Sequence, residues 1–264
     1  MFEKLSERTK ADYRKFLDRF DKNAGTVTVK DIEIKHVVAW RDQLAQSNGA
    51  HYANYFVRVL KVLFKHANQI GEIKGGFNPA HGVEAIKYDK QKPKPWPRDM
   101  IEAARAARPH NDRTRLLFEL LYCTGQRIGD ALSAKWSDVR GDSIEVSQNK
   151  TGTPLVLPMT PDLMECLKHA ERAGETILTA YRKETPWKYR GAADAMMKLR
   201  REIGAEAYTI HGIRHTVASE LGESGVDDDG IMAVTGHKSK GMVAHYAGEA
   251  RQRVRAEKAQ KERK

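Results

Sequence analysis

The sequence predicts a two-part protein, in which an N-terminal helical bundle precedes a larger, mainly helical domain with a small β-hairpin (α+β). Three observations lead to this fold class. Apolar residues recur at helical spacing through most of the chain, and a short alternating pattern surrounds a turn near residue 150. A segment rich in proline and lysine separates the two parts. The chain has 264 residues, which is enough for two domains of ordinary size.

Residues 1–87 are expected to form the helical bundle. Three segments place large apolar or aromatic side chains on one helical face. Gly71 and the pair Gly75–Gly76 end the third segment, and a short fourth segment around residues 82–86 leads out of the bundle. The three helical segments are residues 6–20, 30–45 and 52–70.

Residues 88–97, with the sequence YDKQKPKPWP, are expected to be a basic linker. The segment holds three prolines and three lysines. Proline fixes φ, removes a backbone donor and disfavours helix at the residue before it, so the chain is expected to be extended here. The domain boundary is therefore predicted within this segment.

Residues 98–264 alternate helical segments with one hairpin. The hairpin strands are predicted at 143–146 and 154–157, and the turn between them exposes Lys150 and contains Gly152. Most of the helical segments are bounded by glycine or proline. These segments are residues 98–107, 113–123, 127–136, 161–172, 192–203, 211–223, 227–234 and 242–261.

The composition favours a polyanionic partner. The formal net charge is +11, with 46 Lys and Arg against 35 Asp and Glu. The excess lies at the two ends, because residues 1–97 carry +7, residues 98–248 are neutral and residues 249–264 carry +4. Basic ends supply attraction to phosphates that does not depend on sequence. The tail 249–264 is equally consistent with a solvated helix face.

Other sequence features exclude several classes of protein. No stretch reaches the roughly 20 apolar residues of a membrane span, and the first ten residues lack an apolar signal region, so a cytoplasmic location is expected. The two cysteines, Cys123 and Cys166, stand alone in apolar surroundings and are expected in the core. They provide neither a disulfide framework nor a Cys-based zinc site.

The candidate site residues are ambiguous one at a time. Arg127 stands at a predicted helix start, where a guanidinium and backbone N–H groups converge on a phosphate, although surface arginines are common at such places. His211 and Arg214 lie one helical turn apart, as a surface pair also would. His211 and His215 have the spacing of a zinc-binding helix, but Gly212 occupies the place of the glutamate that a metalloprotease requires. We therefore expect no metal.

Four separated motifs occur in a characteristic order. Together they resemble those of the tyrosine recombinases, the phage integrase family. The resemblance covers residues 98 to about 250, and the preceding bundle is similar to that family's core-DNA-binding domain in position and helix content. The motifs are LLYCTGQRIGDAL (120–132) with WSDV (136–139), QNKTG (148–152), IHGIRHTVASEL (210–221) and VTGHKSKGMVAHYA (234–247).

The sequence departs from the family pattern at three positions. Thr235 stands where leucine is usual, Gly212 where an acidic residue is common, and Asp130 where glutamate is frequent. We interpret Asp130 as a carboxylate that orients neighbouring groups. Many phage integrases also carry a further N-terminal domain that binds arm-type sites. The first predicted helix begins at residue 6, so a simpler or truncated recombinase is expected.

The resemblance implies the chemistry of the site and a catalytic fold for the second domain. Tyr246 is then the nucleophile that forms a 3′-phosphotyrosyl bond, and Arg127 and Arg214 clamp the phosphate. Lys150 is the general acid for the leaving 5′-oxygen, and His211 is the base or proton relay for the tyrosine. His237 donates a hydrogen bond to the phosphate. No cofactor, ATP or divalent metal is implied.

The implied function is a site-specific recombinase that integrates or excises a phage or mobile element. The implied partners are double-stranded DNA, a tetramer of this chain that exchanges C-terminal tails, and an accessory DNA-bending or directionality factor. Two alternatives stay open. A type IB topoisomerase would nick and reseal one duplex without strand exchange, and a non-catalytic basic DNA-binding protein would carry the motif residues by coincidence or as a relic.

Overall fold

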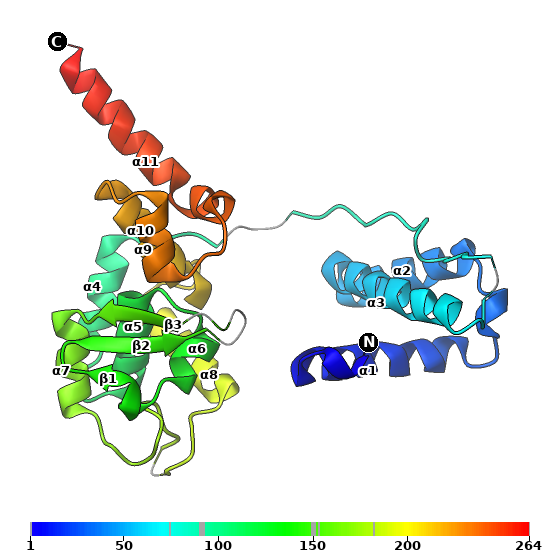
Figure 1. Ribbon diagram of the computed structural model, residues 1–264, viewed down its shortest axis with the longest axis horizontal. Coiled ribbons are helices and arrows are strands. Elements are labelled where there is room, and N and C mark those ends of the chain that lie inside the picture. Colours follow the sequence, from blue (N-terminus) through cyan, green and yellow to red (C-terminus); the bar gives the residue numbers. More distant parts are fainter. Residues whose placement is uncertain are drawn as a thin grey trace. The chain divides into compact units, whose positions relative to one another are not determined.

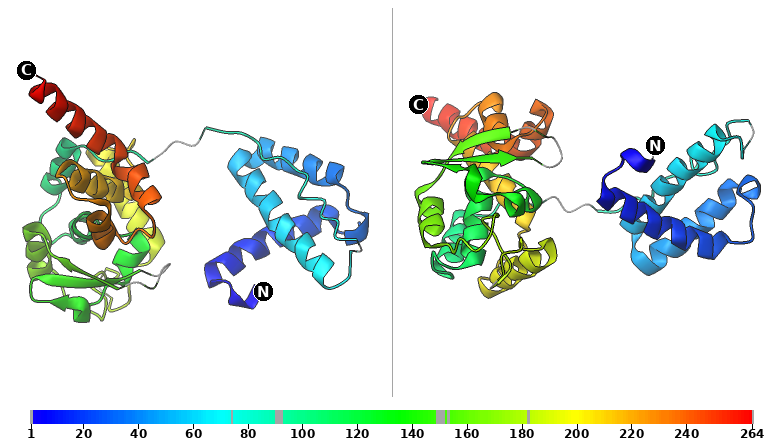
Figure 2. Two further views of the ribbon diagram at one scale, coloured as in Figure 1. Left: turned by 45° about the horizontal axis from the view of Figure 1, so that its top comes forward. Right: turned by 60° about the horizontal axis from the view of Figure 1, so that its bottom comes forward.

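The computed structural model describes the chain except for residues 1, 74, 90–92, 149–151, 153, 182 and 264. The chain divides into two compact units, Met1–Gln91 and Lys92–Lys264, which Figures 1 and 2 show from three sides. The described part of the chain is mostly helical and has one small antiparallel sheet. The predicted fold class is therefore confirmed. None of the described helices is both long and apolar enough to cross a bilayer.

The first unit is built from α-helices that pack around an aromatic core. Ser6 caps the first helix by accepting a hydrogen bond from the Thr9 N–H. Gly49 has φ +83°, which lets the chain reverse between the second and third helices without strain. The described elements are η1 (Phe2–Lys4), α1 (Glu7–Ala24), η2 (Val29–Asp31), α2 (Ile34–Asn48) and α3 (Ala50–Gln69).

The predicted fourth segment of this unit, residues 82–86, has no helix in the structure. The Asn54 side-chain amide bonds both backbone groups of Ile86, accepting from its N–H at 2.9 Å and donating to its carbonyl at 2.8 Å. One side chain of α3 therefore satisfies backbone polar groups that a helix would otherwise satisfy, and the segment stays extended.

The second unit contains the remaining helices and the sheet. The sheet has the order β1-β2-β3 with antiparallel pairing, and Ile144 pairs with Leu157 in its centre. The predicted hairpin is therefore present. The described elements are α4 (Arg98–Ala106), α5 (Arg113–Thr124), α6 (Ile128–Ser133), η3 (Trp136–Asp138), β1 (Val139–Arg140), β2 (Ser143–Ser147), β3 (Pro154–Pro158), α7 (Pro161–His169), α8 (Tyr189–Glu202), α9 (Ile210–Glu223), α10 (Asp228–Thr235) and α11 (Lys240–Glu262).

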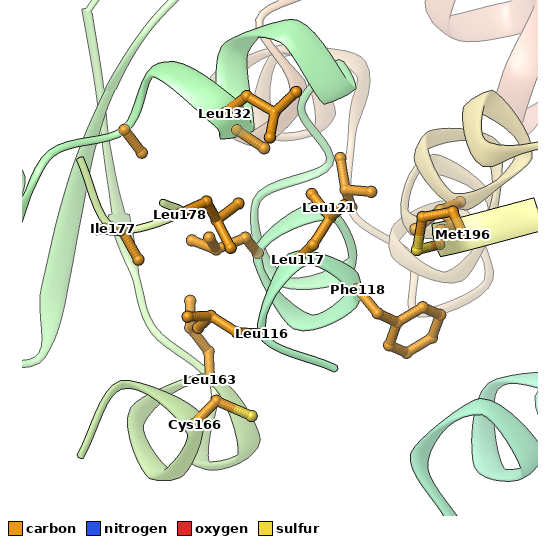
Figure 3. Packing of buried hydrophobic residues seen from close by; sticks show 14 of the residues in the cluster. Leu116, Leu117, Phe118, Leu121, Leu132, Leu163, Cys166, Ile177, Leu178 and Met196 are labelled. Carbon is orange, nitrogen blue, oxygen red and sulfur yellow. The ribbon is translucent and has the colours of Figure 1, made fainter. Parts of the chain in front are cut away.

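Helix α5 forms the centre of this unit and is buried over most of its length. Figure 3 shows its leucines and Phe118 among side chains from α6, α7, α8 and the segment of Ile177 and Leu178. Cys166 is buried in this core, as predicted, whereas Cys123 is only half-buried. Gly125, with φ +61°, ends the helix in the left-handed region and starts the loop to α6.

The predicted helix over residues 127–136 is shorter in the structure and ends at Ser133. The Ala134 carbonyl accepts a hydrogen bond from the Ile177 N–H at 2.9 Å, and the Trp136 N–H donates to the Glu175 carbonyl at 3.1 Å. These bonds to a segment about 40 residues away replace the helical ones. Local periodicity carries no information about such a partner.

Helices α9, α10 and α11 form a second, small core through Ala218, Ile231, Val243 and Ala247. Helices α9 and α11 pack closely because Gly222 faces Ala247, where a Cβ on the glycine would lie 2.9 Å from the alanine Cβ. Beyond this contact α11 extends away from the unit, as Figure 2 shows.

The packing around Gly212 explains why glycine replaces the acidic residue of the family pattern at this position. A Cβ at this position would lie 2.4 Å from the Lys94 carbonyl oxygen and 3.2 Å from the Trp96 ring. The Trp96 indole N–H donates to the Thr209 carbonyl at 2.8 Å, and its backbone N–H donates to the Thr216 hydroxyl at 2.6 Å. The segment before α4 therefore lies directly on α9, in a space that a larger residue would fill.

Candidate active site

Tyr246 lies on α11 against a group of histidines. Its hydroxyl is 3.2 Å from His211 Nε2. The ring centroid of Tyr246 is 4.0 Å from that of His215 and 4.8 Å from that of His237. Residues from α9, α11 and the turn after α10 thus surround one phenol group. The sequence motifs predict His211, His237 and Tyr246 as site residues, and the contact of His215 with the Tyr246 ring adds a histidine for which the sequence offers only a metal-ligand interpretation.

The first turns of helix α9 position the site residues that this helix carries. The Thr209 hydroxyl accepts the Gly212 N–H at 3.0 Å and starts the helix two residues before His211. Spacing of three and four residues then places His211, Arg214 and His215 on one face. The Ser219 hydroxyl donates to the Tyr246 carbonyl at 3.0 Å, so α9 also holds the backbone that carries the tyrosine.

Arg214 is almost fully buried, with 1% of its surface exposed. Its Nη1 donates to the Gly125 carbonyl at 2.8 Å, while Nε and Nη2 have no hydrogen-bond partner among the described residues. Burial and the charge of Arg127 lower the pKa of Arg214 to about 10, so it stays positive at neutral pH. A buried guanidinium with two unused N–H donors is suited to an anion with two acceptor oxygens.

Arg127 is the residue immediately before α6 and is half-buried. Its Nη1 is 3.8 Å from Asp130 Oδ2, which is an ion pair without a hydrogen bond. Asp130 is therefore next to Arg127, as its predicted orienting role requires. Desolvation is the first cause that lowers the pKa of His211 and His237, and the charges of Arg214 and Arg127 lower both pKa values further. The two arginines therefore act on the same pair of imidazoles.

His237 is buried directly after the turn that ends α10. Its Nδ1 is 2.7 Å from the Thr235 hydroxyl oxygen, and Nε2 has no hydrogen-bond partner in the described part of the chain. Burial, followed by the charges of Arg214 and Arg127, lowers the pKa of His237 to about 3. The imidazole is therefore neutral at physiological pH in the free protein.

Two buried glutamines, which are not among the predicted site residues, connect the backbone segments that carry the site. Gln148 Nε2 donates to Gln126 Oε1 at 2.6 Å and to the Thr235 carbonyl at 2.8 Å. Gln126 Nε2 donates to the carbonyls of Thr124 and Val234 at 2.8 and 3.1 Å. Both amides are buried. This amide bridge, Gln126 with Gln148, joins the loop before Arg127, the end of β2 and the end of α10.

Position 236, next to the amide bridge, can hold only glycine in this conformation. It has φ +69°, and a Cβ there would lie 2.2 Å from Gln148 Nε2. The sequence did contain a signal for this contact, since TGQR, QNKTG and VTGH each place a glycine or glutamine within two residues of a site residue. The pairing of the two glutamines depends on the tertiary fold.

Lys150 lies outside the described residues. The hairpin around it begins at Gln148, whose carbonyl accepts the Gly152 N–H at 2.8 Å. Among the described residues no group of three His, Cys, Asp or Glu side chains is arranged to hold a metal ion. His211 and His215, which have zinc-helix spacing, both contact Tyr246 instead.

The arrangement combines a phenol, a neutral imidazole within proton-transfer distance and two arginines with unused donors. A phosphodiester has two non-bridging oxygens that match such donors, and a phenol next to an acceptor nitrogen can attack its phosphorus atom. The site is thus equipped for phosphoryl transfer to Tyr246.

The chain is similar to known integrases in sequence and in fold. The phage integrase family matches residues 98–253. The integrase of Enterobacteria phage 434 is 25% identical over 255 residues, covering 92% of this chain and 70% of the phage protein. A lambda integrase fragment bound as a dimer to a core site is 25% identical with a TM-score of 0.77, covering 92% of this chain and 89% of that one. A lambda integrase tetramer on a Holliday junction is 24% identical with a TM-score of 0.75, covering 90% and 74%.

Proposed function

Because this chain belongs to the phage integrase family, we propose that Arg127 and Arg214 bind one phosphodiester of DNA and that Tyr246 cuts and rejoins the strand there. The protein is a tyrosine-type site-specific DNA recombinase. The observation that supports this assignment most directly is the 3.2 Å distance from His211 Nε2 to the Tyr246 hydroxyl, next to two arginines with unused N–H groups.

In the cleavage step the Tyr246 oxygen attacks phosphorus and forms a 3′-phosphotyrosyl bond, while the bond from phosphorus to the 5′-oxygen breaks. His211 takes the phenol proton, which its lowered pKa permits because the neutral ring is the accepting form. Arg127 and Arg214 bind the non-bridging oxygens and stabilise the charge of the pentacoordinate transition state. Because one phosphodiester replaces another, the step needs no ATP.

Lys150 supplies the proton of the leaving 5′-hydroxyl in this proposal. The lysine ammonium group is a compact proton donor, and its pKa changes readily with its surroundings. Support comes from its sequence position two residues after Gln148, which the amide bridge ties to the end of α10. A substrate whose 5′-bridging oxygen is replaced by sulfur needs no acid, so it should restore cleavage to Lys150→Ala.

We assign the partners on the same basis. DNA is the substrate, and four copies of the chain assemble on two duplexes. An accessory DNA-bending or directionality factor assists integration or excision, which takes place in the cytoplasm. The first unit contributes non-specific DNA binding. It carries an excess of positive charge, and Arg19 and Arg58 lie over the rings of Tyr52 and Tyr55 at 5.6 and 5.5 Å. Basic and aromatic side chains together suit a phosphate backbone.

The test uses a nicked duplex that carries the attachment site found in the DNA flanking the gene. Wild-type protein is expected to trap a covalent 3′-adduct, and Tyr246→Phe is expected to bind the same duplex without forming one. Tyr208→Phe, which removes a hydroxyl from a different part of the unit, is the matched control and should form adduct normally. An undiminished adduct with Tyr246→Phe would contradict the assignment.

The type IB topoisomerase alternative is not favoured, since the relatives are integrases and recombinases. A supercoiled plasmid without an attachment site separates the two activities. The recombinase is expected to leave the plasmid supercoiled, whereas a topoisomerase would relax it. The other alternative, a non-catalytic DNA-binding protein, would form no adduct in the first experiment.

A further inference from the structure

The turn that ends α10 brings Thr235 and His237 together. Gly236 takes a left-handed conformation, with φ +69°, and reverses the chain between them. Thr235 is fully buried, and its backbone carbonyl accepts a hydrogen bond from the amide bridge. Its hydroxyl oxygen is 2.6 Å from the Ile231 carbonyl oxygen and 2.7 Å from His237 Nδ1.

These two distances fix where the hydrogen atoms are. A carbonyl oxygen cannot donate, so the Thr235 hydroxyl must direct its one proton to Ile231. The same hydroxyl can then only accept from His237, which requires a proton on Nδ1. A neutral imidazole carries one N–H, so Nε2 holds a lone pair.

We infer that Thr235 is a positioning residue that holds neutral His237 with its proton on Nδ1 and leaves Nε2, beside Arg127 and Arg214, as an acceptor. The consequence for DNA cleavage rests on the proposed function. Leucine, the usual residue at this position in the family, has no acceptor for Nδ1–H, so this arrangement follows from the particular sequence of this chain.

This arrangement changes what His237 can do. With a lone pair on Nε2 it cannot donate a hydrogen bond to a phosphate until it is protonated. Among the described residues, the groups that face the ring are Arg127 before α6, Arg214, His211 and His215 on α9, and Tyr246 on α11. The two arginines oppose protonation in the free protein, and a bound phosphate anion offsets their charge. Phosphate binding should therefore be coupled to uptake of one proton at His237.

The first test measures the tautomer in the free, full-length protein. Long-range ¹H–¹⁵N spectra of ¹⁵N-histidine-labelled protein distinguish Nδ1–H from Nε2–H, and His237→Gln identifies the signals by their loss. Wild type and Thr235→Ser are expected to show Nδ1–H. Thr235→Val, which has the same shape without the hydroxyl, is expected to shift the signals towards Nε2–H because Nδ1–H would lack an acceptor.

Thr176→Val is the matched control, since it removes a buried threonine hydroxyl, here bonded to the Leu178 carbonyl at 3.2 Å, away from the histidines. It should leave the His237 signals unchanged. An Nε2–H tautomer in wild type would overturn the inference by itself, even if Thr235→Val failed to fold. Unchanged His237 signals in a folded Thr235→Val would overturn it as well.

The second test measures cleavage. Neutral His237 in Thr235→Val can donate from Nε2 without proton uptake, whereas wild type cannot. The ratio of the variant's adduct-forming rate to that of wild type should therefore rise with pH, by up to about tenfold per pH unit for one proton. A ratio independent of pH would overturn the coupling. If wild type formed no adduct at all, the proposed function would fail while the tautomer result still stood.

Discussion

His211 and Tyr246 are 35 residues apart in the sequence, yet the Nε2 atom of the histidine lies 3.2 Å from the phenolic oxygen. This contact joins α9 to α11, and the close approach at Gly222 and the bond from Ser219 to the Tyr246 carbonyl maintain it. The relative position of base and nucleophile is thus determined by helix packing.

We expect cleavage to depend on neutral His211. Its pKa is lowered by desolvation and by the charges of Arg214 and Arg127. The accepting, neutral form therefore persists below pH 6.5, so on the acid side the rate should begin to fall only when the pH drops through that lowered pKa. The measurement is the second-order rate constant of adduct formation against pH, which reports groups of the free protein.

His211→Gln should lose this acid limb and form adduct about 10²-fold more slowly or worse. His169→Gln is a suitable control, because that histidine pairs with Glu165 on the exposed side of α7. An unchanged acid limb in His211→Gln would show that another group accepts the proton.

The two arginines should contribute to cleavage far more than to binding. Arg214→Ala or Arg127→Ala is expected to lower the cleavage rate by about 10²-fold or more, because each removes donors aimed at developing charge. Arg214→Lys should not restore it, since one ammonium cannot bond the Gly125 carbonyl and also offer two planar N–H groups. Single-turnover cleavage and DNA binding are measured in parallel, with Arg113→Ala, which lies over Trp187, as control.

The amide bridge should show energetic coupling between its two glutamines. Gln148→Leu leaves Gln126 Oε1 and the Thr235 carbonyl without their donor, at a cost of about 1–3 kcal/mol in the free energy of unfolding. In a double-mutant cycle measured by urea unfolding, Gln126→Leu and Gln148→Leu are expected to be non-additive. Asn78 is a buried amide of the first unit, and the effect of Asn78→Leu on the free energy of unfolding should simply add to that of Gln148→Leu. Additive effects of the two glutamines would contradict a direct bond.

A buried ion network should dominate the electrostatic stability of the second unit. Glu119 is fully buried and accepts hydrogen bonds from Arg105 Nε and Nη2, each at 2.9 Å, and from Arg115 Nε at 2.8 Å. Glu119→Gln is expected to lower the free energy of unfolding by about 3 kcal/mol or more, because it removes the fully buried carboxylate that two guanidinium groups share and leaves them only the partly exposed Asp162. Glu165→Gln, at an exposed ion pair, should leave it unchanged. Equal effects in thermal unfolding would refute the network's importance.

The parts of the fold that the sequence predicted are those with a local signal. The apolar run ending at Gly125 predicted α5, and alternation around Gly152 predicted the hairpin. The two-residue strand β1 is too short to show a period, and α6 ends early because Ala134 bonds Ile177, which periodicity does not reveal.

The candidate site follows the same rule. Spacing alone placed His211 and Arg214 on one helical face, and the motif order indicated Tyr246 and His237. The contact of Gln126 with Gln148 spans 22 residues and that of His211 with Tyr246 spans 35, so both required the folded chain. Thr235 was visible in the sequence as a departure from the family pattern, but its bond to His237 depends on the left-handed turn at Gly236.

The C-terminal half of α11 should act in assembly on DNA and not in the folding of the unit. Arg251 is paired with Asp228, and Arg253 with Glu223, which ties the helix to its own unit up to that point. The described residues beyond Val254 are exposed and mostly charged, so they bury little surface on their own chain. A helix that leaves its unit in this way can disorder, lie on DNA phosphates or dock on a neighbouring copy, and the family resemblance favours the last.

Deletion of residues 255–264 keeps both arginine anchors, whereas deletion from 251 would remove them and confound the result. The shorter deletion should leave thermal unfolding and single-site DNA binding nearly unchanged. It should reduce formation of the complex of two duplexes and alter the yield of Tyr246 adduct, because contact between copies can bias the position of the helix that carries the nucleophile. Native gels with one and two labelled duplexes measure both steps. Replacement of the five basic residues of 255–264 by glutamine, with the helix retained, separates the remaining outcomes. Loss of single-site binding would indicate a phosphate-binding tail, and normal recombination by the deleted protein would rule out a role in assembly.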